Sequence, residues 1–231
     1  MTIAHAAEIH FGGKRESAKK RIQRLKAAGF VKERSRKPYE PSILHLASKG
    51  VTSLSERGIL TEYPSLSRTA IERRNRVSEL TLRHELQVMD VKAAIYKAVR
   101  ASPEIEIERF CTWPHLCEIG GGGKAWSQIA WIARPDGFLR FRRDRRLHCI
   151  FLELDRSTES QGTLLAKAKR YASYQASEPG RKPATIHFIF STDARKRNAE
   201  LTFAKSPLSG RIRIRSSTLE EVLSWPLKLV S

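Results

Sequence analysis

Residues 131–169 read WIARPDGFLRFRRDRRLHCIFLELDRSTESQGTLLAKAK, a stretch that predicts two strands followed by a helix. An apolar stretch ends in Pro135-Asp136-Gly137, a basic turn follows, and the apolar run 150–152 leads into Glu153-Leu154-Asp155. A continuous apolar run of this kind is typical of a strand covered on both faces. Glu153 and Asp155 have the same parity along that strand, so we expect both side chains on one of its faces.

The carboxylates of this stretch form a candidate metal site. Three acids at neighbouring strand ends repel one another unless a cation or a proton separates them, and Mg²⁺ or Mn²⁺ accounts for the set most simply. Asp136, Glu153 and Asp155 are the acids that would surround such an ion, with Asp155 expected to assist. On the helix that follows, Lys167 could orient a water or offset phosphate charge. The alternative interpretation is a plain turn at 135–137 beside two surface acids.

The overall charge of the chain indicates a polyanionic partner. Among 231 residues, 43 Lys and Arg stand against 24 Asp and Glu, which gives a net charge of +19, so DNA is the expected partner. The absence of a long apolar run or a signal-peptide pattern argues against a membrane partner. Three cysteines without a CxxC pair fit a reduced, cytoplasmic setting. A zinc site through Cys111, His115 and Cys117 lacks a fourth ligand at matching spacing, so buried thiols are favoured.

The first 62 residues predict a winged-helix DNA-binding domain. Residues 14–28 form a basic helix with Ala18, Ile22 and Leu25 on its apolar face, and Gly29 is a suitable C-terminal stop. Short strands at 30–34 and 43–46 follow around a basic turn, and a basic second helix before a hairpin is the winged-helix arrangement. The alternative is a solvated amphipathic helix. Little chain precedes the first helix, which leaves open that the N-terminus is incomplete. The expected DNA contacts are Lys14, Lys19, Lys20, Arg21, Arg24, Arg36 and Lys37, together with Arg142, Arg143 and Arg145 of the later basic turn.

Residues 63–75 are an expected linker, and 76–231 an expected second domain of the α+β class. A long helix over 76–100 carries an apolar stripe, and Glu85 flanks that stripe. Strands are expected at 105–112, 130–142, 148–154 and 185–191, with a helix at 161–176 before the last of them. The order is therefore αβββαβ, followed by an edge strand at 211–215 and a closing helix at 218–225.

This order, with P-D, then E-x-D, then a helix lysine, resembles the PD-(D/E)XK nuclease superfamily. The longer pattern is more similar to the plasmid replication-relaxation family, through Leu82-Arg83-His84-Glu85-Leu86, Pro135-Asp136, the run 153–159 and Lys167 with Tyr171. The resemblance implies a restriction-endonuclease-like fold, metal ligation by Asp136 and Glu153, and an accessory acid at Glu85. It also implies that Lys167 positions the water. Where the superfamily usually has a lysine this chain has Asp155, so activity requires that the helix supply the lysine, with Lys169 as the less favoured candidate.

The sequence therefore predicts a cytoplasmic DNA-binding protein of a plasmid or mobile element. One hypothesis is metal-dependent DNA nicking in replication-relaxation or mobilisation. The other is a replication or transcription factor that uses an inactive nuclease fold to bind DNA or a partner. A homodimer, or a complex with replication or mobilisation proteins, is compatible with either.

Overall fold

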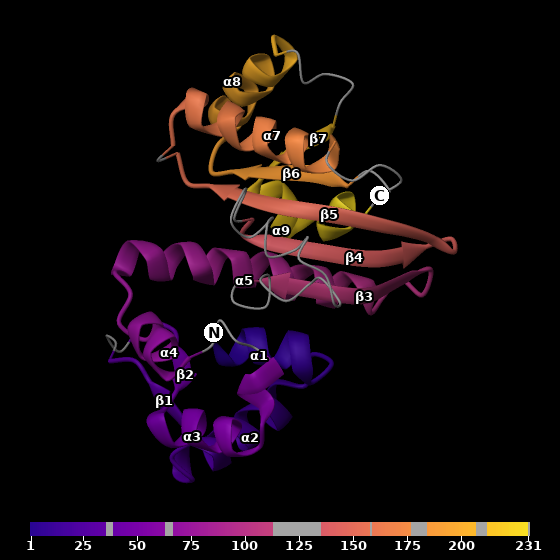
Figure 1. Cartoon of the computed structure of the whole chain (residues 1–231). Helices are drawn as coiled ribbons and strands as arrows, with labels where there is room; N and C mark the ends of the chain where they lie inside the picture. Colours follow the sequence, from indigo (N-terminus) through magenta and orange to yellow (C-terminus); the bar gives the residue numbers. More distant parts are fainter. Residues whose placement is uncertain are drawn as a thin grey trace. The chain divides into compact units, whose positions relative to one another are not determined.

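The computed structural model describes residues 1–35, 39–62, 67–112, 135–157, 159–176, 184–206 and 212–230. The chain divides into two compact units, Met1–Arg100 and Ala101–Ser231, which follow the colour bar from indigo to magenta and on to yellow (Figure 1). Helices combine with a five-stranded mixed sheet, which confirms the α+β class. The domain limits of 1–62, 63–75 and 76–231 stay a prediction.

Unit 1 begins with helix, helix, hairpin and helix, and its second helix and hairpin lie where the sequence predicts them. Its elements are α1 Ile3–His10, α2 Arg15–Ala27, β1 Val31–Glu33, β2 Leu44–Leu46, α3 Ser48–Glu56, η1 Ile59–Glu62, α4 Arg68–Arg74 and α5 Glu79–Val99. Strands β1 and β2 are antiparallel. Helix α4 lies within the segment that the sequence assigns to a linker.

Helix α2 has the two faces that its sequence predicts. Ala18 and Ile22 are buried, and Leu25 is half-buried. The helix ends where Gly29 takes φ +77°, and the Phe30 amide donates to the Leu25 carbonyl at 2.9 Å. This closure needs a residue that adopts positive φ without strain, which is why glycine suits the position.

Unit 2 is built on one sheet in the order β3-β4-β5-β6-β7. The strands are β3 Ile105–Thr112, β4 Gly137–Arg143, β5 Arg146–Asp155, β6 Thr185–Phe190 and β7 Arg213–Thr218, and the helices are α7 Gln161–Ala176, α8 Asp193–Ala204, α9 Leu219–Ser224 and η3 Pro226–Leu229. The first three strands are antiparallel, and β6 and β7 run parallel to β5.

Helices α7 and α8 cover one face of this sheet, which we call the α7 face. Phe138, Phe151 and Phe188 point to that face from β4, β5 and β6, and they share a core with Tyr171 of α7 and Phe203 of α8. Glu153 and Asp155 have the same parity as Phe151 and therefore point into the same layer. The core thus fixes the carboxyl end of β5 beneath α7 and α8, and Figure 1 shows these two helices above the sheet.

Candidate functional site

Asp136 and Glu153 come together where β4 begins and β5 ends. Asp136 immediately precedes Gly137, the first residue of β4, and most of the apolar stretch expected before it lies outside the described residues. Its amide donates to the Leu152 carbonyl at 2.9 Å, and its Oδ2 accepts from the Leu154 amide at 2.7 Å. Because β4 and β5 are antiparallel, the start of one strand meets the end of the other. The carboxylate of Asp136 is thereby fixed beside Glu153.

Helix α7 supplies two donors to the Glu153 carboxylate. Lys167 Nζ donates to Glu153 Oε2 at 2.9 Å, and the Tyr171 hydroxyl donates to Oε1 at 2.5 Å. Lys167 and Tyr171 lie four residues apart on one helix face, so both reach the same acid. Lys167 also pairs with Glu159 at 2.8 Å. The structure therefore brings together Asp136, Glu153 and Lys167. It adds Tyr171 and Glu159, to which sequence reasoning gave no role.

Burial determines the electrostatics of this site, because Glu153 is only 2% exposed. Burial first, and the nearby Asp136 charge second, raise the pKa of Glu153 to about 8 despite Lys167 and Tyr171. Burial lowers the pKa of Lys167, but Glu153 and Glu159 outweigh it, so this pKa lies above its usual value. At neutral pH the two crowded acids thus retain a proton that a bound cation would displace.

Asp155 points to the same face as Glu153 but meets a different partner. Its Oδ2 accepts from Arg195 Nε of α8 at 2.5 Å, and its Oδ1 accepts from the Ser157 amide at 3.0 Å. Only 4% of Asp155 is exposed, so an unpaired charge there would be costly and Arg195 neutralises it. Sequence reasoning missed Arg195, and the assisting role expected of Asp155 stays a prediction.

The donor set fits a divalent cation bound by two carboxylates. Within the described residues, no group of three His, Cys, Asp or Glu side chains is arranged to hold a metal ion. Mg²⁺, however, commonly binds through one or two carboxylates and completes its shell with waters and substrate phosphates. Asp136 and Glu153 are such a pair, and their crowding favours a cation. Of the zinc alternative, Cys111 is buried in the core, whereas His115 and Cys117 lie outside the described residues.

Glu85, the expected accessory acid, lies on α5 in unit 1. Its Oε1 forms an ion pair with Arg74 Nη2 of α4 at 2.7 Å. Burial raises the pKa of Glu85 and outweighs the opposing effect of Arg74. The pair links α4 to α5, and the accessory role of Glu85 stays a prediction.

The basic residues expected on α2 are exposed. These are Lys14, Lys19, Lys20, Arg21 and Arg24, of which Lys14 immediately precedes the helix. Arg36 and Lys37 lie outside the described residues. All five side chains are exposed to solvent, whereas Ala18 and Ile22 of α2 are buried, so the helix presents basic residues to solvent.

The basic turn of unit 2 is divided between the two faces of the sheet. Arg140 and Arg142 Nε atoms both contact Glu108, at 2.9 and 2.5 Å. Arg143 Nη1 donates to the Val230 carbonyl at 3.3 Å. Arg145 is exposed at the turn with φ +63°. Of the three arginines predicted from this turn, Arg142 and Arg145 are exposed, and Arg142 is paired with Glu108.

An aromatic pocket of about 240 Å³ lies on the α7 face beside the carboxylates. Phe138, Phe151, Tyr171 and Tyr174 line it, with Arg140 among the polar residues. Because the hydroxyl of Tyr171 bonds to Glu153, one residue borders both the pocket and the candidate site. Sequence reasoning missed this pocket, since it depends on where α7 crosses the sheet.

The pKa of Glu153 predicts a pH-dependent stability. The pKa of Glu153 in the folded state, about 8, lies above the ordinary 4.5. The stability that protonated Glu153 contributes is therefore complete below pH 4.5 and is lost as pH rises through 8. Between about pH 6.5 and 8, wild type should lose on the order of 2 kcal/mol of unfolding free energy relative to Glu153→Gln. Urea denaturation of both proteins in metal-free buffer measures this difference. The effects of other titrating groups cancel when the two pH profiles are subtracted. Parallel pH profiles for the two proteins would contradict it.

Comparison with known proteins identifies the family. No curated protein and no solved structure matches the chain significantly. Among the described helices, none has both the length and the apolar character needed to cross a membrane. The family described as replication-relaxation matches residues 1–186, which include α2, Asp136, Glu153 and Lys167. The match covers most of the sequence, and the chain therefore belongs to the replication-relaxation family.

Proposed function

We propose that this protein binds DNA in the replication or mobilisation of a plasmid or mobile element and nicks it in a metal-dependent reaction. Membership of the replication-relaxation family supports the biological setting. A net charge of +19 supports a polyanionic partner. The single observation that carries the catalytic part is Lys167 Nζ at 2.9 Å from Glu153 Oε2, next to Asp136.

Unit 1 is the proposed duplex-binding part, and it binds as a winged helix. Its helix, helix, hairpin order supports this, as does the exposed basic face of α2. In that arrangement the second helix lies in the major groove, and its lysines and arginines contact phosphates and base edges. Affinity then depends strongly on salt, because each neutralised phosphate releases a counterion.

Unit 2 is the proposed catalytic part. Asp136 and Glu153 would hold Mg²⁺ or Mn²⁺, which when bound neutralises phosphate charge and makes a water more acidic. Lys167 would donate a hydrogen bond to the attacking water and position it for attack on phosphorus. Tyr171 fixes the Glu153 carboxylate from its other oxygen, and Glu159 keeps Lys167 charged beside it.

A second function, DNA binding without cleavage, is favoured by a different observation. Asp155 is neutralised by Arg195, and both oxygens of Glu153 accept hydrogen bonds from α7. An acid satisfied in this way can serve as a structural link between strand and helix. The two functions differ in one property, since only the catalytic one requires that the carboxylates exchange a proton for a metal ion.

Calorimetry of the purified chain with Mn²⁺ or Mg²⁺ separates the two functions. If Asp136 and Glu153 bind metal, a concentration about a hundredfold above Kd should raise the unit 2 transition by roughly 5–10 °C. Glu153→Gln should abolish this rise, whereas Glu104→Gln, which changes an exposed acid of unit 2, should retain it. An unchanged wild-type transition at 10-fold higher metal would support binding without cleavage.

A further inference from the structure

A second cavity, of about 580 Å³, lies along the edge strand β7. Its polar residues include His187 of β6, Arg215 and Ser217 of β7, and Lys228 of η3. His187 pairs in register with Arg215 and has the parity opposite to that of Phe188 and Glu153. This group therefore lies on the face of the sheet opposite to the candidate carboxylate site.

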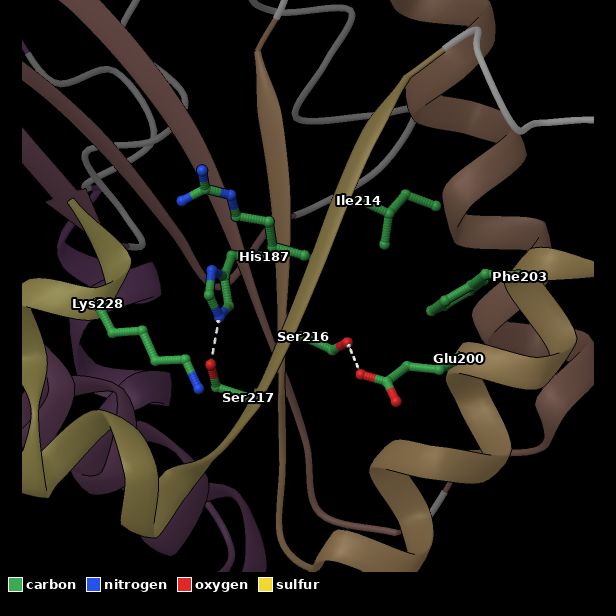
Figure 2. Close-up of a pocket in the computed structure, with 8 residues that line it drawn as sticks. His187, Glu200, Phe203, Ile214, Ser216, Ser217 and Lys228 are labelled. Carbon is green, nitrogen blue, oxygen red and sulfur yellow. Dashed lines mark hydrogen bonds between the residues drawn. The ribbon is translucent and has the colours of Figure 1, made fainter. Parts of the chain in front are cut away.

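The cavity has residues from both sides of β7, and the two sides differ in charge. Figure 2 shows His187, Ser217 and Lys228 on one side of the strand and Glu200 on the other. The acid on that far side accepts a hydrogen bond from Ser216 Oγ at 2.6 Å. The side that holds His187 is therefore the one suited to an anion.

Two cations and one shared acid surround the His187 side of the cavity. Arg215 and Lys228 line it. Glu221 Oε1 is 3.5 Å from Lys228 Nζ but accepts a closer hydrogen bond, at 2.9 Å, from Lys196. Its other oxygen accepts from the Thr218 amide at 2.8 Å. Glu221 is thus shared among Lys228, Lys196 and a helix cap, and Arg215 and Lys228 place two positive charges on this side of the cavity.

The floor of this side holds a buried imidazole with an unused atom. His187 is 2% exposed and Ser217 is fully buried. His187 Nε2 and Ser217 Oγ are 3.0 Å apart, whereas His187 Nδ1 has no hydrogen-bond partner among the described residues. Burial, and then the charges of Arg215 and Lys228, lower the pKa of His187 to about 3, so the ring is neutral. A buried polar atom without a partner is unusual in a native protein and calls for a ligand or a water.

We propose that this side of the cavity binds a phosphate group through Arg215, Lys228 and His187, with Ser217 fixing the tautomer of the His187 ring. A guanidinium can bind two phosphate oxygens at once, and a lysine adds a compact point charge. If the Ser217 hydroxyl donates to His187 Nε2, the ring proton lies on Nδ1 and donates to the phosphate. The phosphate is either free or part of DNA, and the DNA source rests on the proposed function.

Nitrogen-15 NMR of the histidine side chains in the full chain tests the site directly. At pH 7.5 the expected tautomer of His187 carries its proton on Nδ1. The probes are inorganic phosphate, the 5′-phosphorylated dinucleotide pTpT and the unphosphorylated TpT. Saturable shifts of the His187 ring with all three, or with inorganic phosphate and pTpT, support a general phosphate site. Shifts with pTpT alone, or equally with pTpT and TpT, support a DNA-borne phosphate.

A charge-removing pair of variants makes the assignment specific. Arg215→Met with Lys228→Met should weaken probe binding at least about tenfold, because both charge-assisted contacts are lost. Arg170→Met with Arg197→Met removes the same charge from exposed positions of α7 and α8 and should leave affinity unchanged. The proposal would be overturned if the Arg215→Met, Lys228→Met variant bound the probes as tightly as wild type. It would also be overturned if the His187 ring carried its proton on Nε2, or if no probe at tens of millimolar shifted the His187 signals. Duplex binding through α2 and nicking at Glu153 are measured separately, so their failure would not be confused with this one.

Discussion

Lys167→Met and Glu153→Gln should each reduce plasmid nicking at least about a thousandfold, through different losses. Methionine keeps most of the lysine stem but no donor, so the water loses its proposed positioning group while both carboxylates remain. Glutamine keeps the shape of Glu153 but not its charge, so metal binding is lost as well. Agarose gels of supercoiled plasmid over a time course measure the rates.

Calorimetry separates these two variants from each other. Lys167→Met should retain the Mn²⁺-dependent rise in melting temperature, and Glu153→Gln should not. Lys169→Met is the matched comparison, because this lysine is exposed two residues further along α7 and is the less favoured candidate for the catalytic lysine. Full nicking by Lys167→Met would remove Lys167 from the mechanism, and loss of nicking in Lys169→Met alone would assign the role to Lys169.

The triple variant Lys20→Ala, Arg21→Ala, Arg24→Ala should weaken duplex binding at least about a hundredfold at low salt. The slope of log affinity against log salt should fall by about three units, one for each lost phosphate contact. Alanine is the best helix former, and the buried Ala18 and Ile22 are untouched, so α2 should still fold. Fluorescence anisotropy on labelled duplex at several salt concentrations measures both quantities.

A charge-matched control tests whether position matters as well as charge. Arg170→Ala, Arg197→Ala and Lys205→Ala remove three exposed cations from unit 2. This control should change duplex affinity by less than about threefold at moderate salt. Equal losses in the two triples would indicate generic attraction to the basic chain, and an unaffected α2 triple would move the DNA surface elsewhere, first to Arg145.

Elements with a clear apolar period could be predicted from the sequence, and those without one could not. Helix α7 lies at 161–176, as expected, and the apolar run 150–152 is the buried centre of β5. Helix α8 escaped prediction because only Ala199 and Phe203 of its twelve residues are buried. The one local signal was Thr192-Asp193, whose threonine caps the first turn.

The same distinction applies to the candidate site. Parity placed Glu153 and Asp155 on one strand face, and helix spacing placed Lys167 and Tyr171 on one helix face. That both α7 residues reach Glu153 depends on how α7 packs on β5. The Asp155–Arg195 pair joins residues 40 positions apart on elements packed by the fold. The His187 cavity likewise depends on how β6, β7 and η3 meet. Such long-range partners carry no periodic signal, and only the tertiary structure reveals them.

Incubation of wild-type protein with supercoiled plasmid in Mn²⁺, Mg²⁺ or EDTA tests the central claim most directly. If Asp136, Glu153 and Lys167 form a nicking site, open-circular DNA should accumulate with either metal and none should form with EDTA. The product should appear in proportion to protein and time, and Glu153→Gln from the same preparation route should yield none. If wild type binds duplex but leaves the plasmid supercoiled with both metals at protein excess, the nicking function is contradicted, and DNA binding without cleavage takes its place.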